Sequence, residues 1–123
     1  MTAIHRADED RNPATGTDAS WQSFLPTPPI QDHPSTHSVL GAAAAVVLAS
    51  VLRTDTMSFT MMSPSALAQS PERKITSFSA AARENAESRI KAGLHFRYAI
   101  EAGLDLGRKI GGAASRKLMP VIE

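Results

Sequence analysis

Histidine, serine, arginine and carboxylate side chains must carry any chemistry in this 123-residue sequence, because it contains no cysteine. Thiolate catalysis, disulfide scaffolds and cysteine-built zinc sites are therefore excluded. His37 follows Ser35 and Thr36 directly before a run of Ala, Val and Leu that is typical of a helix. Ser35 or Thr36 could be a plain cap of this helix. Alternatively, the unpaired N–H groups and the dipole at the helix start form an anion site, with His37 beside the anion.

Arg89 and His95, six residues apart, form a second candidate group. In an unbroken helix six residues turn through about 600°, which leaves the two side chains about 120° apart. Gly93 lies between them and predicts a break, so that Arg89 ends one helix and His95 opens the next. Both side chains could then face one pocket with His37. The sequence thus predicts a phosphate-like site made by two helix starts and one guanidinium.

Three helices are expected to position these residues, over about 38–52, 77–93 and 95–117. The first is apolar nearly all round, which predicts that it is the most buried of the three. Helical glycine costs about 1 kcal/mol relative to alanine, so a glycine stripe in the third helix predicts close contact with another helix. The stripe has small residues at spacing four: Ala99, Gly103, Gly107 and Gly111.

The rest of the chain is expected to be irregular. Residues 1–34 are rich in Pro, Thr, Asp and Ser without a helical or alternating period, and Trp21 is interpreted as a packing anchor for this arm. Residues 53–77 are interpreted as a connector with a short strand or edge at about 58–62. The predicted fold class is all-α, a partial helical bundle with a long irregular N-terminal arm.

Composition and charge exclude several classes of partner. A net charge of +1, from 13 Lys+Arg against 12 Asp+Glu, leaves no basic field for a nucleic acid. The longest apolar run, 39–52, is shorter than the roughly 20 residues that cross a bilayer, so no membrane span is expected. No export signal is visible in the first ten residues, which are charged and polar.

Three stretches carry a resemblance to a known family. "PTPPIQDHPSTHS" resembles the second signature of the vanadium-dependent haloperoxidases and their relatives, the type 2 phosphatidic acid phosphatases, in which a Pro-rich run leads to Pro-Ser-Gly-His. "SRIKAGLHFRYAIEAGLDLGRKIG" resembles the third signature, a Ser-Arg pair followed by His six residues after the Arg. "ADEDRNPATGTDASWQSFLPTPP" is similar to the approach loop of the bacterial haloperoxidase-like branch. The resemblance implies an approach arm over 1–36 and the helical C-terminal half of such a domain over 37–123.

The resemblance also implies a role for each candidate residue. His95 matches the histidine that bonds to vanadate in the peroxidases and attacks phosphorus in the phosphatases, and His37 matches the acid-base histidine. Arg89 and Ser35 match residues that bind the oxyanion oxygens. Thr36 is placed in the same oxyanion site, where the family has a glycine whose backbone N–H approaches the anion.

Two further departures from the family pattern bear on activity. Ala99 stands four residues after His95, where many relatives carry an aspartate, and Glu101 is the carboxylate nearby in the sequence. In the family a first signature with a lysine and an arginine comes before the approach loop, at which this sequence begins. We therefore expect a truncated fragment in which oxyanion binding is weakened, because each charge-assisted hydrogen bond contributes roughly 1.5–3 kcal/mol.

The function implied is vanadium-dependent haloperoxidase-like oxidation of halide by hydrogen peroxide, with vanadate as cofactor and weak or no activity in this chain. One alternative is phosphomonoester hydrolysis at the same oxyanion site. Another is a non-catalytic remnant that associates with a partner chain, supported by an apolar helix with little chain to cover it. A small-molecule substrate is expected, and a homo-oligomer is left open.

Overall fold

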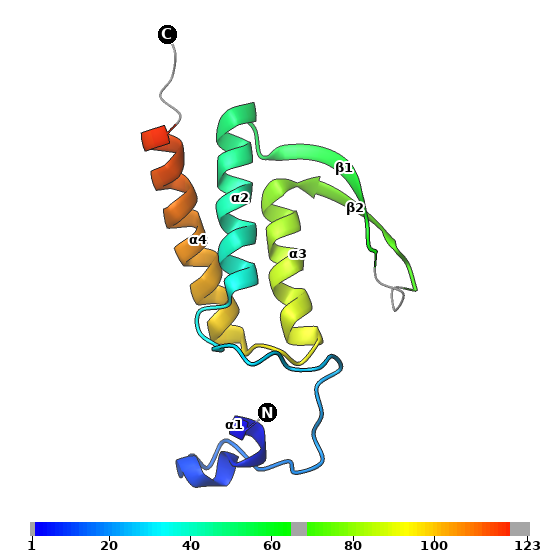
Figure 1. Cartoon of the computed structure of the whole chain (residues 1–123), viewed down its shortest axis with the longest axis vertical. Coiled ribbons are helices and arrows are strands. Elements are labelled where there is room, and N and C mark those ends of the chain that lie inside the picture. The colour runs from blue at the N-terminus through cyan, green and yellow to red at the C-terminus, as the bar shows by residue number, and fades with distance from the viewer. Residues whose placement is uncertain (1, 65–68, 119–123) are drawn as a thin grey trace.

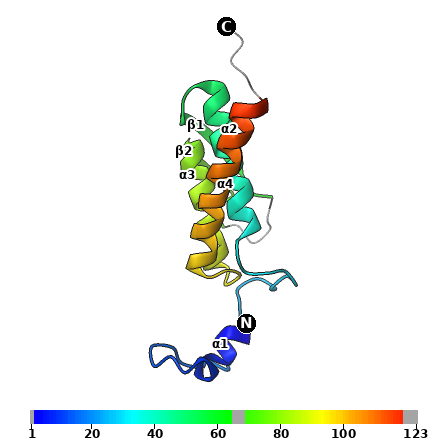
Figure 2. The same cartoon turned by 90° about the vertical axis from the view of Figure 1, so that its left-hand side faces the viewer.

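The computed structural model describes residues 2–64 and 69–118, and its main body consists of three helices and a hairpin (Figure 1). The helices α2 (Thr36–Leu52), α3 (Phe78–Lys91) and α4 (Arg97–Leu118) lie side by side. Figures 1 and 2 show that α2 and α4 run in the same direction and that α3 runs against them. The start of α2, the end of α3 and the start of α4 therefore meet at one end of the bundle.

The predicted helix boundaries at this end are confirmed. Helix α2 begins one residue before His37, α3 ends at Lys91, and α4 begins two residues after His95. Gly93 takes a positive φ of 72°, which L-residues with a side chain rarely adopt. A Cβ at Gly93 would also lie 3.0 Å from Cζ2 of Trp21, so the indole packs against this turn, as expected of a packing anchor.

The glycine stripe of α4 lies against α2, as its spacing predicts. A Cβ at Gly103 would lie 2.6 Å from the carbonyl oxygen of Ser35, and a Cβ at Gly111 would lie 2.7 Å from that of Ala43. A Cβ at Gly107 would overlap the carbonyl oxygen of Val39. The missing side chains thus let the two backbones approach closely, and this contact holds the N-terminus of α2 beside α4.

The expectation that α2 is the most buried helix is wrong. Its inner face is made of small residues, of which Ser38, Ala42 and Ala45 are buried. Its larger side chains point outward, and Leu40 is 66% and Val51 54% exposed. Helix α4 buries six residues, because its glycines and Ile100 face the centre of the bundle. An apolar sequence all round a helix predicted burial, but the described residues cover only one side of it.

The structure is mostly helical, as the all-α prediction expected, but the segment interpreted as a connector contains a small two-stranded antiparallel sheet. Strand β1 (Thr56–Met62) pairs with β2 (Glu72–Ser77). Threonine, phenylalanine and isoleucine favour strands, and the β2 side chain of Ile75 is buried. The predicted short edge at 58–62 falls within β1, whereas β2 was missed because its charged residues hide its period. Residues 65–68 of the connector lie outside the described residues.

The sequence predicted an irregular N-terminal segment, but part of this segment is regular. It contains a short helix α1 (Thr2–His5) and a 3-10 turn (Ala7–Asp10) that ends at Arg11 in the left-handed region. His5 Nε2 lies 3.0 Å from the backbone oxygen of Trp21, which folds this segment onto itself. In Figure 1 helix α1 lies beyond the end of the bundle at which α2 and α4 begin, and Trp21 joins this segment to the Gly93 turn.

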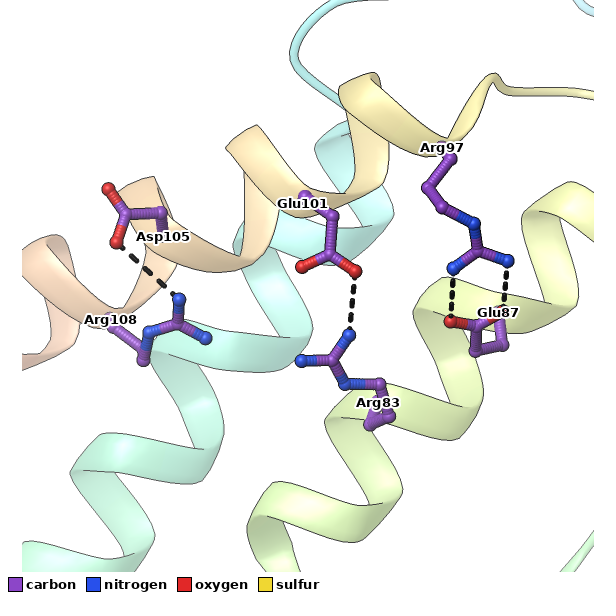
Figure 3. A network of polar contacts seen from close by, with 6 residues as sticks. All are labelled: Arg83, Glu87, Arg97, Glu101, Asp105 and Arg108. Atoms are coloured by element: carbon purple, nitrogen blue, oxygen red, sulfur yellow. Dashed lines mark hydrogen bonds and ion pairs between the residues drawn. The ribbon is translucent and has the colours of Figure 1, made fainter.

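Ion pairs join α3 to α4 along their exposed sides (Figure 3). Two nitrogens of Arg97 donate to the two oxygens of Glu87, at 3.0 and 3.3 Å, and Arg83 donates to Glu101 at 2.7 Å. Exposed pairs of this kind contribute about 0.2–1 kcal/mol each. Their main effect is to fix the register of α3 against α4.

Within the described ranges, no helix is both long enough and apolar enough to span a membrane.

Candidate functional site

The candidate site lies at the end of the bundle where α2 begins, α3 ends and α4 begins (Figure 1). The backbone oxygen of Arg89 accepts hydrogen bonds from the N–H groups of Leu94 and His95, at 2.9 and 3.4 Å, across the Gly93 turn. The N–H of Ser35 donates to the backbone oxygen of Ala99 at 3.0 Å. These bonds bring two segments that are far apart in the sequence to one place.

Ser35 occupies the N-cap position of α2 but does not act as a cap. Its side chain accepts no hydrogen bond from the first turn of the helix, and the residue is 0% exposed. Its Oγ has no hydrogen-bond partner among the described residues. Ser77 at the N-cap of α3 contrasts with it, because its Oγ accepts from the N–H of Ala80 at 3.0 Å. The plain-cap alternative is therefore not what the structure shows for Ser35.

Arg89 and His95 also present buried polar atoms without partners. Within the described part of the chain, Nε of Arg89 and Nε2 of His95 make no hydrogen bond, although both atoms are buried. The His95 side chain is only 1% exposed. Burial lowers the pKa of Arg89 from its usual value.

Buried polar groups in folded proteins are almost always paired, so these unpaired atoms call for a ligand. The donor set fits an oxyanion such as vanadate: a guanidinium N–H and a hydroxyl can donate to its oxygens, and Nε2 of His95 can offer a lone pair. Across residues 2–64 and 69–118 there is no group of three or more histidine and carboxylate side chains placed to hold a metal ion.

His37 lies within electrostatic reach of both of these residues. Its pKa is lowered from the ordinary histidine value, first by partial burial and then by Arg89 and His95. Its side chain is exposed on the solvent side, and its backbone oxygen accepts from Nδ2 of Asn85 at 3.0 Å. A histidine that loses its proton readily and faces solvent can exchange a proton with a bound molecule.

Thr36 is exposed and is the first residue of α2. Its backbone is helical, so the position needs no positive φ and accepts a β-branched residue without strain. The N–H groups of the first helical turn have no partner within an α-helix. Thr36 can therefore offer its backbone N–H to an anion, and its side chain makes no contact that the candidate site requires.

Asp32 is a residue of this region that the sequence analysis missed. Its Oδ1 lies 2.9 Å from Nδ1 of His95 and accepts from the N–H of Phe96 at 3.3 Å. Glu101, the carboxylate near His95 in the sequence, pairs with Arg83 instead. One signal could have pointed to Asp32: it is the only Asp, Glu, Lys or Arg between Asp18 and Arg53.

Comparison with known proteins assigns the family. The VCPO second helical-bundle domain family matches residues 2–123. Among solved structures, the first bacterial vanadium-dependent iodoperoxidase is 36% identical over 94% of this chain, with a TM-score of 0.73, and the match covers 25% of that protein. A holo-type bacterial vanadium-dependent chloroperoxidase is 20% identical over 80% of this chain, with a TM-score of 0.67, and the match covers 23% of it. At that identity the second likeness shows the fold alone.

No curated protein matches the sequence. The chain spans about a quarter of the length of the two solved relatives. The family match extends over nearly every residue, and the iodoperoxidase likeness is both above 30% identity and nearly complete over this chain. The chain therefore belongs to the vanadium haloperoxidase family, in which it matches the second helical-bundle domain.

Proposed function

We propose that the chain supplies a vanadate site of the haloperoxidase type. At such a site halide is oxidised by hydrogen peroxide. The single observation that carries this proposal is that three of the six buried and unpaired side-chain atoms in the described part of the chain belong to Ser35, Arg89 and His95. These atoms belong to the residues that resemble the oxyanion ligands of the second and third family signatures. A hydroxyl, a guanidinium and an imidazole nitrogen are together suited to binding an oxyanion.

Each residue has a distinct part in this proposal. His95 holds the vanadate through Nε2, while Arg89 and Ser35 donate hydrogen bonds to its oxygens. The backbone N–H of Thr36, in the first turn of α2, would donate to the same anion. His37 accepts and returns a proton, since its lowered pKa keeps it neutral near pH 7. When bound, vanadate supplies Lewis-acid activation of peroxide.

The electrostatics support weak binding by the 123-residue chain. Vanadate carries more than one negative charge, whereas the permanent cation at the site among the described residues is Arg89. Each charge-assisted hydrogen bond that a vanadate oxygen does not receive weakens vanadate binding by roughly 1.5–3 kcal/mol, or about one to two decades in affinity. We therefore expect slow halide oxidation or none from this chain alone.

A halide-oxidation assay with added vanadate and hydrogen peroxide tests the proposal, using iodide and bromide as substrates. Slow, vanadate-dependent oxidation that is lost in His95→Ala supports it. Lys91→Ala is the matched control, because Lys91 ends α3 near the same turn but is exposed to solvent. Hydrolysis of a phosphomonoester that depends on His95, without halide oxidation, would instead identify the chain as a phosphatase.

A specific observation favours a second function, association with another polypeptide. The outward face of α2 exposes large apolar side chains: Leu40, Leu48, Val51 and Leu52. Exposed apolar patches of this kind mark protein–protein contacts. Light scattering of the purified chain tests this function. A concentration-dependent increase in mass that Leu48→Glu abolishes supports association, and a monomer at all concentrations refutes self-association.

A further inference from the structure

We propose that Asp32 is the positioning residue of His95, which fixes the ring tautomer so that the unprotonated Nε2 faces the oxyanion. The role of this contact in oxyanion binding rests on the proposed function, whereas the tautomer of His95 is a property of the protein without any ligand. Neither the family signatures quoted above nor the comparisons assign a role to this carboxylate.

The contact between the two residues is direct, and its histidine side is shielded from water. Oδ1 of Asp32 lies 2.9 Å from Nδ1 of His95, whose side chain is 1% exposed, while the Asp32 side chain is 29% exposed. An ionised carboxylate can only accept hydrogen bonds, so the shared proton lies on Nδ1. Neutral imidazole carries one proton, so Nε2 is left with its lone pair.

The other ring nitrogen shows where this lone pair is needed. Nε2 of His95 is buried and has no partner among the described residues. Without Asp32, a neutral ring is free to carry its proton on Nε2, where the proton would occupy the position that must bind the oxyanion. Histidine ligands of metals commonly donate their second N–H to a carboxylate, and this contact fixes both tautomer and ring orientation.

A second hydrogen bond holds Asp32 in place. The same Oδ1 accepts from the N–H of Phe96 at 3.3 Å, directly before α4 begins. The carboxylate is thereby tied to the turn that carries His95. Ala99, four residues after His95 on α4, has no polar side chain, and the carboxylate at this histidine comes instead from the segment before α2.

Nitrogen-15 NMR of the imidazole rings in the vanadate-free protein tests this inference. Spectra are recorded at two mildly alkaline pH values, so that the nitrogen shifts themselves identify the neutral ring and the nitrogen that carries its proton. The wild-type chain should show His95 protonated on Nδ1. In Asp32→Ala a substantial fraction of the proton should move to Nε2, and in Asp32→Asn, whose amide oxygen can still accept, the ring should remain protonated mainly on Nδ1.

Asp55→Ala is the matched control. Oδ1 of Asp55 accepts from the N–H of Ser79 at 2.9 Å, so this variant also removes a carboxylate from a helix start, at the opposite end of the bundle. It should leave the His95 tautomer unchanged, while both alanine variants lower the melting temperature. Finding Nε2 protonated in the wild-type protein, or the same tautomer in wild type and Asp32→Ala, would overturn the inference.

Vanadate titration of the same proteins separates this inference from the proposed function. Loss of a contact to a metal-binding histidine lowers affinity about 10–100-fold, which is expected for Asp32→Ala and not for Asp55→Ala. If the wild-type chain binds no vanadate but Asp32→Ala still shifts the tautomer, the proposed function fails and the role of Asp32 stands. If Asp32→Ala binds vanadate as tightly as wild type, Asp32 does not position His95 for the anion.

Discussion

Replacing Ser35 with alanine separates a helix cap from a ligand-binding residue, and Ser77→Ala is its matched control. Both serines occupy the residue before a helix. The hydroxyl of Ser77 accepts from the backbone N–H of Ala80 at 3.0 Å, whereas that of Ser35 is buried without a partner in the described chain. The same chemical change is therefore expected to affect stability differently at the two positions.

The structure sets the size of this difference. Loss of a serine cap costs about 0.5–2 kcal/mol of unfolding free energy, which applies to Ser77→Ala. Ser35→Ala removes a buried hydroxyl that has no partner in the described chain, and burying such a group unpaired costs about 1–3 kcal/mol. The small void left behind offsets part of this gain, so we expect Ser35→Ala to be unchanged or up to about 1 kcal/mol more stable. The two variants should differ by about 0.5–3 kcal/mol.

Urea denaturation followed by circular dichroism measures this difference. A vanadate titration of the same variants should show the opposite order, because Ser35→Ala loses a hydrogen bond to a charged ligand and about 10–100-fold in affinity. If Ser35→Ala loses as much stability as Ser77→Ala, its hydroxyl has a partner in the folded protein. The assignment of Ser35 to an oxyanion site would then be refuted.

Two further predictions concern the helix contact and the electrostatics of the site. Gly107→Ala should destabilise the chain by up to about 2 kcal/mol in urea denaturation, because overpacking of about 1–3 kcal/mol outweighs a helix-propensity gain of about 1 kcal/mol. Gly112→Ala, off the contact with α2, should keep that gain, and equal effects of the two would refute the packing argument. The pKa of His37 measured by NMR should lie below its value in the unfolded chain, about 6.5. The contribution of His37 to the free energy of unfolding should therefore be full above about pH 6.5 and be lost as the pH falls through the pKa of the folded state. Arg89→Gln should raise this pKa and Arg83→Gln should not; no change with Arg89→Gln would contradict the predicted proximity.

The sequence predicted the parts of the fold that depend on local rules. Gly93 marked the turn between α3 and α4, and the stripe of small residues marked the face of α4 that meets α2. Both follow from the absence of a Cβ, which one sequence is enough to recognise. The helix start beside His37 was predictable from the sharp change to Ala, Val and Leu that follows it, and the start beside His95 from the break at Gly93.

The parts that the sequence did not predict depend on contacts between distant segments. The outward face of α2 is as apolar as a buried surface. Helix composition does not indicate how much of the chain is available to cover that face. Asp32 lies far from His95 in the sequence, so no spacing rule connects them, although its isolation in an otherwise uncharged stretch was a signal. The hairpin was not predicted, because strand β2 begins with three charged residues, Glu72, Arg73 and Lys74.

Vanadate binding by the wild-type chain and by His95→Ala, followed by vanadium NMR titration, tests the central claim most directly. The claim is that Ser35, Arg89 and His95 form one oxyanion site at the junction of α2, α3 and α4. We predict weak, saturable binding with one vanadate per wild-type chain, and no saturable binding to His95→Ala at the same protein concentration. Equal binding to both proteins, or no saturable binding to the folded wild-type chain at any vanadate concentration, would contradict the claim.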